Sequence, residues 1–187
     1  MLLLVTFTPI AAAVLIMLGL PARLTALAAS GLTLLISVLL FLGFDSVARG
    51  FQFVFSIPLS TELRLNLALG VDGLSLLMIL LGAIVLLAAV WFTAEIDHHE
   101  NAFYACLLLI AGGAIGAFAS LNLFFFYAFH ELALIPTFLI IGIWGTGNRR
   151  AAAWKVTIYL ALGSVILLVG LIMLYRAVPS SACSLEF

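Results

Sequence analysis

The sequence predicts an all-α polytopic membrane protein with about six transmembrane helices and a short β-hairpin-like loop between the second and third. Of its 187 residues, 66% are hydrophobic and 8% are charged, and the mean hydropathy is +1.38. A soluble domain of this size cannot bury so much apolar surface. The apolar residues also form runs of about 20 residues, which is the length needed to span a bilayer. The net charge of −1 argues against a nucleic-acid partner.

The predicted spans form a single transmembrane domain over residues 1–187. They lie at about 1–20, 23–44, 71–94, 101–119, 121–145 and 152–177. The first run lacks the basic start of a signal peptide and another span follows at once, so we expect a retained helix. Cys106 and Cys183 occur in no CxxC or Cys/His spacing, so we expect no metal site and no required disulfide.

The loop 95–101 contains three acids and two histidines. Its histidines, His98 and His99, are adjacent and lack the i, i+4 spacing that preorganises metal ligands on a helix. A solvated loop is therefore the favoured interpretation.

Residues 45–70 break the helical pattern. Apolar residues alternate with other residues before and after a turn-like segment at 58–62: Phe51, Phe53, Phe55 and Ile57, then Leu63, Leu65, Leu67 and Leu69. This period of two predicts a β-hairpin with one apolar face, lying at the membrane surface or against a neighbouring subunit. Because a five-residue turn is longer than the common type, an extended loop is the alternative.

Two short motifs flank the third and fourth spans. Asp72 precedes an uninterrupted apolar helix, where an N-cap acceptor is expected; helix capping is the favoured role, and a surface role in proton exit is the alternative. In the fourth span, Gly112 and Gly116 form a GxxxG pair, and Gly113 with Ala117 adds a second ridge of small residues. Such ridges let another backbone approach closely, and the short turn at 120–122 suggests a partner within the chain.

One carboxylate, Glu131, lies near the middle of the apolar span 121–145. A carboxylate at bilayer depth costs about 2.5–3.5 kcal/mol on insertion scales, so Glu131 should face the bundle interior or a water-filled cavity. Pro136 has no N–H, so the Leu132 carbonyl loses its helical partner and we expect a helix kink just past the acid. Such an acid can exchange a proton when a neighbouring charge moves. The alternative is a neutral acid that joins two helices by a hydrogen bond.

Three further residues are possible supports for Glu131. Tyr127 lies four residues earlier and shares its helix face, whereas His130 is rotated by about 100°. A proton relay through His130 is possible, but a histidine hydrogen-bonded to an adjacent helix is favoured. Lys155, the only lysine, lies near the membrane edge, where snorkelling is its ordinary role. We therefore do not expect it to be the partner of Glu131.

The densest cations are Arg149, Arg150 and Lys155. By the positive-inside rule, the loop 145–151 is cytoplasmic, and the N-terminus and the hairpin lie outside.

The segment with Glu131 resembles a known family. Residues 126–145 read FYAFHELALIPTFLIIGIWG, and GVDGLS at 70–75 and AAAWKVTIYLALGS at 151–164 stand in matching order. These stretches resemble subunit M (chain 4) of proton-pumping NADH:quinone oxidoreductase, respiratory complex I, an antiporter-like subunit. The acid with Leu-Ile-Pro and the later Trp-Gly are typical of the M type rather than the related L and N types. The resemblance covers the whole chain but only about the first third of a usual family member.

The resemblance implies that Glu131 matches a proton-relay acid that stands opposite a lysine on a seventh, broken helix. Protons would pass along such buried charges while electrons move from NADH to quinone in partner subunits. That lysine has no counterpart in these six spans, so we expect a truncated chain that does not pump alone. His130 stands where many relatives have Trp.

The resemblance also implies partners and location. We expect other membrane-arm subunits, a bacterial inner membrane, and NADH, FMN, iron–sulfur clusters and quinone in partner subunits. This chain shows no NAD-binding glycine loop, flavin motif or cluster cysteines, so we expect no cofactor of its own. The alternatives are a D-type subunit of a multisubunit Na⁺/H⁺ antiporter or the matching hydrogenase subunit, and a structural remnant without function.

Overall fold

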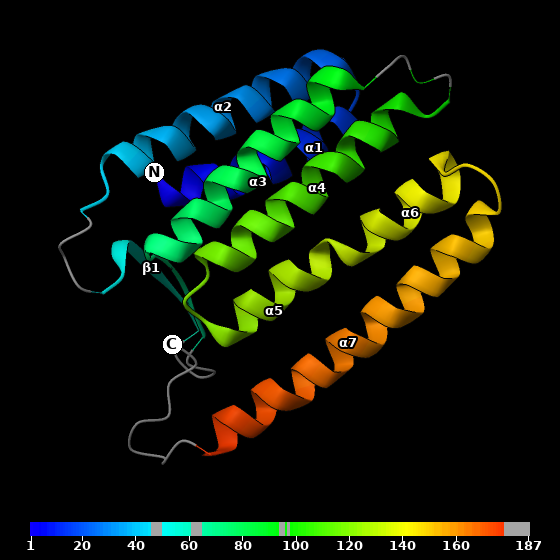
Figure 1. Cartoon of the computed structure of the whole chain (residues 1–187). Coiled ribbons are helices and arrows are strands. Elements are labelled where there is room, and N and C mark those ends of the chain that lie inside the picture. The colour runs from blue at the N-terminus through cyan, green and yellow to red at the C-terminus, as the bar shows by residue number, and fades with distance from the viewer. Residues whose placement is uncertain (46–49, 61–64, 94–95, 97, 178–187) are drawn as a thin grey trace.

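The computed structural model describes residues 1–45, 50–60, 65–93, 96 and 98–177. Its elements in chain order are α1 (Leu2–Met17), α2 (Ala22–Leu42), β1 (Gln52–Ser60), β2 (Leu65–Val71), α3 (Gly73–Phe92), α4 (Glu100–Ala119), α5 (Leu123–Leu132), α6 (Leu134–Trp144) and α7 (Arg149–Ala177). The helices run back and forth in one bundle, and the small sheet lies at one end (Figure 1). The predicted helical membrane fold with a hairpin between the second and third helices is confirmed.

Among the described residues, five helical segments are long and apolar enough to cross a bilayer: α2, α3, α4, the combined segment Leu123–Trp144, and α7. Helix α1 is equally apolar but has 16 residues, which is about 24 Å and shorter than the ~30 Å hydrocarbon core. The chain leaves this helix before the predicted end at residue 20. Gly19 adopts a φ of 108°, which other residues reach only with strain, and so allows the tight turn into α2.

The buried core lies mainly among α1 to α4, and α4 is the central helix. It packs against α1, α2, α3, α5 and α6. By contrast, α7 lies along the outer side of α5 and α6 (Figure 1), and of its 29 residues only Ala153 and Ser164 are buried. Most of its surface is apolar and exposed, which is typical of a membrane-spanning helix.

Strands β1 and β2 form an antiparallel pair, but β1 does not present a single apolar face. Between the pairs Gln52–Val71 and Phe55–Leu69, β1 has one residue more than β2, and Phe53 has a φ of 54°. This bulge shifts the alternation of side chains, so Phe53 no longer shares the face of Phe55 and Ile57, which pair with Leu69 and Leu67. The turn also begins later than predicted, because Pro58 pairs with Asn66 within the strand, as proline can at a sheet edge. Residues 61–64 lie outside the described part.

The hairpin is joined to the start of the helix that carries Glu131. The Leu121 N–H donates to the Ala68 carbonyl at 2.9 Å, and Ser120 pairs with Leu69. A Cβ at Gly70 would lie 2.7 Å from Leu121 Cδ1, so a larger residue at this position would require the Leu121 side chain to move. Asn122 then caps α5 by accepting the Phe124 N–H at 2.9 Å, which fixes where α5 begins.

Candidate functional site

The predicted span 121–145 is two helices, with Ala133 between α5 and α6. Pro136 supplies no N–H to the Leu132 carbonyl, so the backbone is not held by the regular hydrogen bond at this point. One residue later, the Ala133 carbonyl accepts two hydrogen bonds from Thr137, one from its N–H at 3.2 Å and one from its hydroxyl at 2.7 Å. The interruption therefore lies two residues after Glu131, and the side chain of Thr137 helps to stabilise it.

Glu131 and α7 are connected by a short hydrogen-bond chain. The Ser164 hydroxyl donates to Glu131 Oε2 at 2.5 Å, and the Tyr127 hydroxyl lies 3.0 Å from Ser164 Oγ. Ser164 is 2% exposed, whereas Glu131 and Tyr127 are half-buried. Tyr127 thus lies on the same face as Glu131, but it contacts the acid through Ser164.

The direction of this hydrogen-bond chain depends on the protonation of Glu131. A hydroxyl has one hydrogen to donate, so when Ser164 donates to the carboxylate, Tyr127 must donate to Ser164. A protonated Glu131 can donate to Ser164 Oγ instead, and Ser164 can then donate to Tyr127. Only hydroxyl hydrogens need to rotate, so the three side chains can accommodate either state without moving a heavy atom.

The backbone that carries Glu131 packs directly on α4. A Cβ at Gly113 would lie 2.7 Å from the Phe129 carbonyl oxygen and 3.3 Å from the Ala133 nitrogen. The two predicted GxxxG residues contact different helices: a Cβ at Gly112 would lie 2.6 Å from Ile10 Cγ1 on α1, and one at Gly116 would lie 2.5 Å from the Phe129 ring. Small residues on α4 therefore set the depth of α5, with Gly113 nearest to its backbone.

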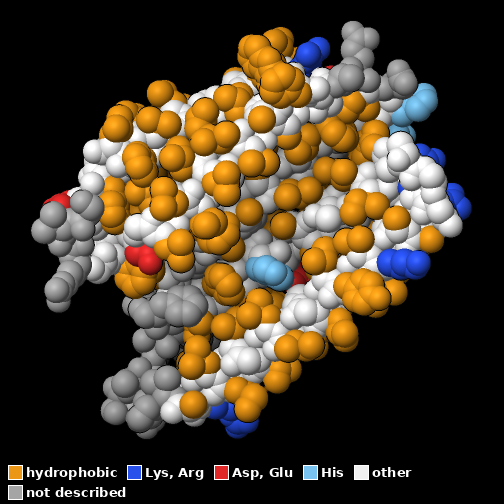
Figure 2. Space-filling model, in the orientation of Figure 1, with side chains coloured by type: hydrophobic (Ala, Val, Ile, Leu, Met, Phe, Trp, Pro, Cys, Tyr) orange, Lys and Arg blue, Asp and Glu red, His pale blue; other side chains and the backbone are white. Residues whose placement is uncertain are grey.

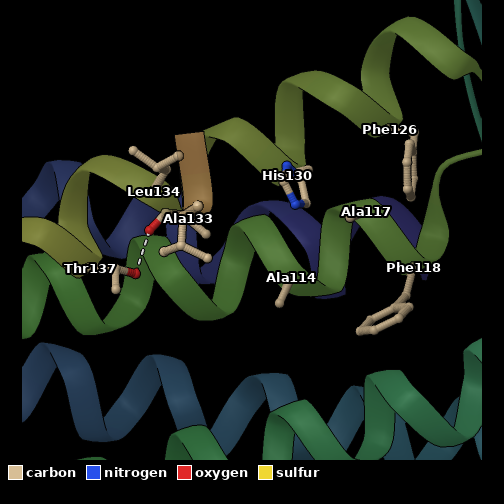
Figure 3. A pocket seen from close by; sticks show the side chains of 9 residues that line it. Ala114, Ala117, Phe118, Phe126, His130, Ala133, Leu134 and Thr137 are labelled. Atoms are coloured by element: carbon tan, nitrogen blue, oxygen red, sulfur yellow. Dashed lines mark hydrogen bonds between the residues drawn. The ribbon is translucent and has the colours of Figure 1, made fainter. Parts of the chain in front are cut away.

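His130 faces another direction from Glu131. It is exposed and lines a cavity of about 350 Å³ together with Ala114, Ala117, Phe118, Phe126, Ala133, Leu134, Thr137 and Leu160. Figure 3 shows His130 from α5 on one side of this cavity, with Ala114 and Ala117 of α4 opposite. The lining is almost entirely apolar, and Glu131 is not part of it. The structure thus separates the two neighbouring titratable residues.

The other two predicted supports lie away from Glu131. Lys155 is nine residues before Ser164 on α7, which is about 13 Å along the helix axis. Asp72 caps α3: Asp72 Oδ1 accepts the Ser75 N–H at 2.7 Å, and Ser75 Oγ accepts the Asp72 N–H at 2.9 Å. Because the hydrogen bond from the Ser75 N–H favours the ionised form, the pKa of Asp72 is below its ordinary value of 3.8. Capping fully accounts for this position.

Sequence reasoning missed Ser164. The available signal was a hydroxyl-bearing side chain in the middle of an apolar span, because polar side chains at such positions commonly form hydrogen bonds between helices. Its partner lies 33 residues earlier, and no spacing rule connects the two positions. Among the described residues, no group of three or more His, Cys, Asp or Glu comes together as a metal site.

Residues 120–185, which include the Glu131–Ser164 contact, match the family described as NADH:quinone oxidoreductase/Mrp antiporter, TM. Subunit M of the NADH-quinone oxidoreductase of Rhodobacter capsulatus is 38% identical over 154 residues, covering 82% of this chain and 30% of the relative. The chain is therefore similar to antiporter-like membrane subunits over these residues.

The names of the similar proteins include two different electron donors, NADH and F(420)H(2). Subunit M of the F(420)H(2) dehydrogenase of Methanosarcina mazei is 38% identical over 153 residues, covering 81% of this chain and 30% of the relative. The NADH-quinone oxidoreductase subunit M of Rickettsia conorii is 35% identical over 156 residues, covering 83% and 32%. The chain therefore spans about 30% of the length of these relatives.

Two solved structures share the fold of this chain. A chain of respiratory complex I from Thermus thermophilus with bound NADH is 28% identical, with a TM-score of 0.83, and the match covers 100% of this chain and 38% of that one. A chain of an archaeal membrane-bound sulfane sulfur reductase is 17% identical with a TM-score of 0.79, covering 97% and 28%. The second likeness concerns the fold alone.

Proposed function

We propose that this chain forms the first part of an M-type membrane-arm subunit that translocates protons, and that Glu131 binds and releases a proton on that path. The observation that carries the proposal is the hydrogen-bonded carboxylate inside a membrane-spanning segment, beside a helix break and joined to Ser164 and Tyr127. A carboxylate is costly at this depth, and a purely structural contact between two apolar helices does not require one.

In the proposed mechanism, the hydroxyl groups support both protonation states of Glu131. The Ser164 hydroxyl stabilises the ionised carboxylate by donating to it, and it accepts a hydrogen bond when the carboxyl group is protonated. Electrons would pass from NADH to quinone in partner subunits that hold the FMN, iron–sulfur clusters and quinone. The resulting change would reach this chain through the neighbouring membrane-arm subunits and lead to proton binding or release at Glu131.

The proposed location is the inner membrane of a bacterium. Arg23 lies just after the α1–α2 turn, and Arg149, Arg150 and Lys155 follow the α6–α7 turn. Successive antiparallel helices bring these turns to the same end of the bundle (Figure 1). Under the positive-inside rule this end is cytoplasmic, and the N-terminus and hairpin are then outside.

The test is proton pumping by the intact respiratory complex that contains this chain. We expect Glu131→Gln to abolish most NADH-driven acidification of inverted membrane vesicles, because the amide cannot exchange a proton, and Glu131→Asp to retain part of it. Glu100→Gln is the matched control, since Glu100 is an exposed carboxylate at the start of α4. Pumping by the Glu131→Gln complex at the level of this control would refute the proposed role.

A second candidate is the same proton-translocating role in a complex with a different electron donor. It is favoured by the 38% identity to the M subunit of the Methanosarcina mazei F(420)H(2) dehydrogenase, equal to that for the Rhodobacter capsulatus protein. Affinity purification of the tagged chain from its source membranes separates the two. Co-purification of NADH-oxidising subunits supports the first candidate, and subunits that oxidise a deazaflavin support the second.

A further inference from the structure

A cavity lies between α6 and α7 near the turn that connects them. It has a volume of about 410 Å³ and is lined by Phe138, Leu139, Gly142, Ile143, Arg149, Arg150, Ala153 and Trp154. The two arginines follow the α6 residues of this set and open its α7 part, and the other lining residues are glycine, aliphatic or aromatic. None of the lining residues is acidic. This cavity is separate from the Glu131–Ser164 contact and from the cavity that His130 lines.

The basic part of the cavity is held in place by the helix ends. Arg149 donates from Nη1 to the Ile143 carbonyl at 2.5 Å, which places its guanidinium group at the end of α6. A guanidinium group has five N–H donors, and this bond uses one of them. Because α7 begins at Arg149, the positive end of the helix dipole adds to the two arginine charges. Figure 2 shows Lys and Arg side chains gathered at this end of the molecule.

The apolar part of the cavity continues along the helices. The rings of Phe138 and Trp154 meet edge to face, with centroids 5.5 Å apart, and Trp154 is 61% exposed. Tryptophan is enriched at membrane–water interfaces, which agrees with its position one turn into α7. The arginines are thus at headgroup level, and Phe138 and Leu139 lie deeper along α6, toward the hydrocarbon.

We propose that this cavity binds one anionic phospholipid. Its phosphate would bind between Arg149 and Arg150, and an acyl chain would lie along Phe138 and Ile143. The paired arginines favour a phosphate oxyanion because they offer several N–H donors in a fixed geometry. The apolar walls favour a ligand with a hydrocarbon chain over a free anion. Basic sites between transmembrane helices have this preference for anionic headgroups. The inference does not depend on the proton-relay proposal.

The test is lipid titration of the purified chain in detergent, followed by native mass spectrometry. The probes are phosphatidylglycerol and phosphatidylcholine with the same acyl chains. We expect phosphatidylglycerol to bind more tightly, and R149Q/R150Q to weaken its binding on the order of 30-fold while leaving phosphatidylcholine binding unchanged. Arg176→Gln is the matched control, because it removes one exposed charge at the other end of α7.

Three results would overturn the proposal. One is equal phosphatidylglycerol binding by the wild type and R149Q/R150Q. Another is a loss of phosphatidylglycerol binding in Arg176→Gln as large as that in R149Q/R150Q, which would indicate general attraction to positive charge. The third is displacement of phosphatidylglycerol by inorganic phosphate together with no effect of Phe138→Ala, which would indicate a simple anion site. Unchanged phosphatidylcholine binding and helical circular dichroism show that the variants are folded.

Discussion

Replacement of Gly113 by alanine tests whether α4 sets the position of the Glu131 backbone. The new Cβ would lie 2.7 Å from the Phe129 carbonyl oxygen, closer than carbon and oxygen atoms normally approach. A backbone carbonyl cannot rotate away as a side chain does, so α5 would have to move. Gly163→Ala is the matched control, because Gly163 is also in a helix interior and a Cβ there meets no atom within 4 Å.

The comparison of these two variants isolates the steric cost. Both replace a helical glycine by alanine, and the gain in helix propensity of up to about 1 kcal/mol is common to both. The difference is then the cost of overpacking, about 1–3 kcal/mol. At roughly 2–4 °C per kcal/mol for a chain of this size, a cost of about 2 kcal/mol makes Gly113→Ala unfold roughly 4–8 °C below Gly163→Ala.

A thiol-reactive fluorophore measures this difference directly. Cys106 is buried on α4, so it reacts only when the helix packing opens. The chain has two cysteines, and a Cys183→Ser background leaves Cys106 as the single reporter. Equal unfolding temperatures for Gly113→Ala and Gly163→Ala in this background would refute the assigned close contact between α4 and α5.

Two further predictions concern single hydrogen bonds. Ser164→Ala should lower proton pumping in the intact complex by roughly 10-fold or more, because a hydrogen bond to a charged group contributes about 1.5–3 kcal/mol and about 1.4 kcal/mol is a factor of ten. Ser164→Thr keeps the hydroxyl and should restore pumping, and equal pumping in all three proteins would contradict the assigned contact. Asp72→Ala should destabilise the chain by about 1 kcal/mol through loss of the α3 cap. Because the folded pKa of Asp72 is lowered, ionised Asp72 stabilises the fold above about pH 4 and this contribution is lost as the pH falls through the folded pKa. Thermal unfolding of wild type and Asp72→Asn at several pH values measures this contribution. The wild type should lose stability relative to Asp72→Asn below pH 4, and a difference in unfolding temperature that does not change with pH would contradict the prediction.

The membrane helices were predictable because their signal is local. Each is an apolar run of the length that a bilayer requires, and the same reasoning found the hairpin from its period of two. The single apolar face of β1 was a wrong prediction because the bulge at Phe53 resets the alternation. A bulge depends on how two strands pair, so the sequence of one strand alone does not indicate where a bulge occurs.

The candidate site was predictable only on one helix. Glu131 was identified by its charge in an apolar span, and Tyr127 by its i, i−4 spacing on the same face. Ser164 was not identified, because its contact with Glu131 depends on how α7 lies against α5 and α6. The different helices contacted by Gly112 and Gly116 could not be assigned for the same reason: a small-residue motif indicates close packing but does not name the partner.

The attachment of α7 has a mechanical consequence. Of the 29 residues of this helix, only the small residues Ala153 and Ser164 are buried, and Ser164 makes the 2.5 Å hydrogen bond to Glu131. An increase of about 1 Å in this distance brings the contact to the limit of a hydrogen bond, and this is less than the 1.5 Å rise of a single residue. A slide of the outermost helix by less than the rise of one residue is therefore enough to separate the Ser164 hydroxyl from the Glu131 carboxylate.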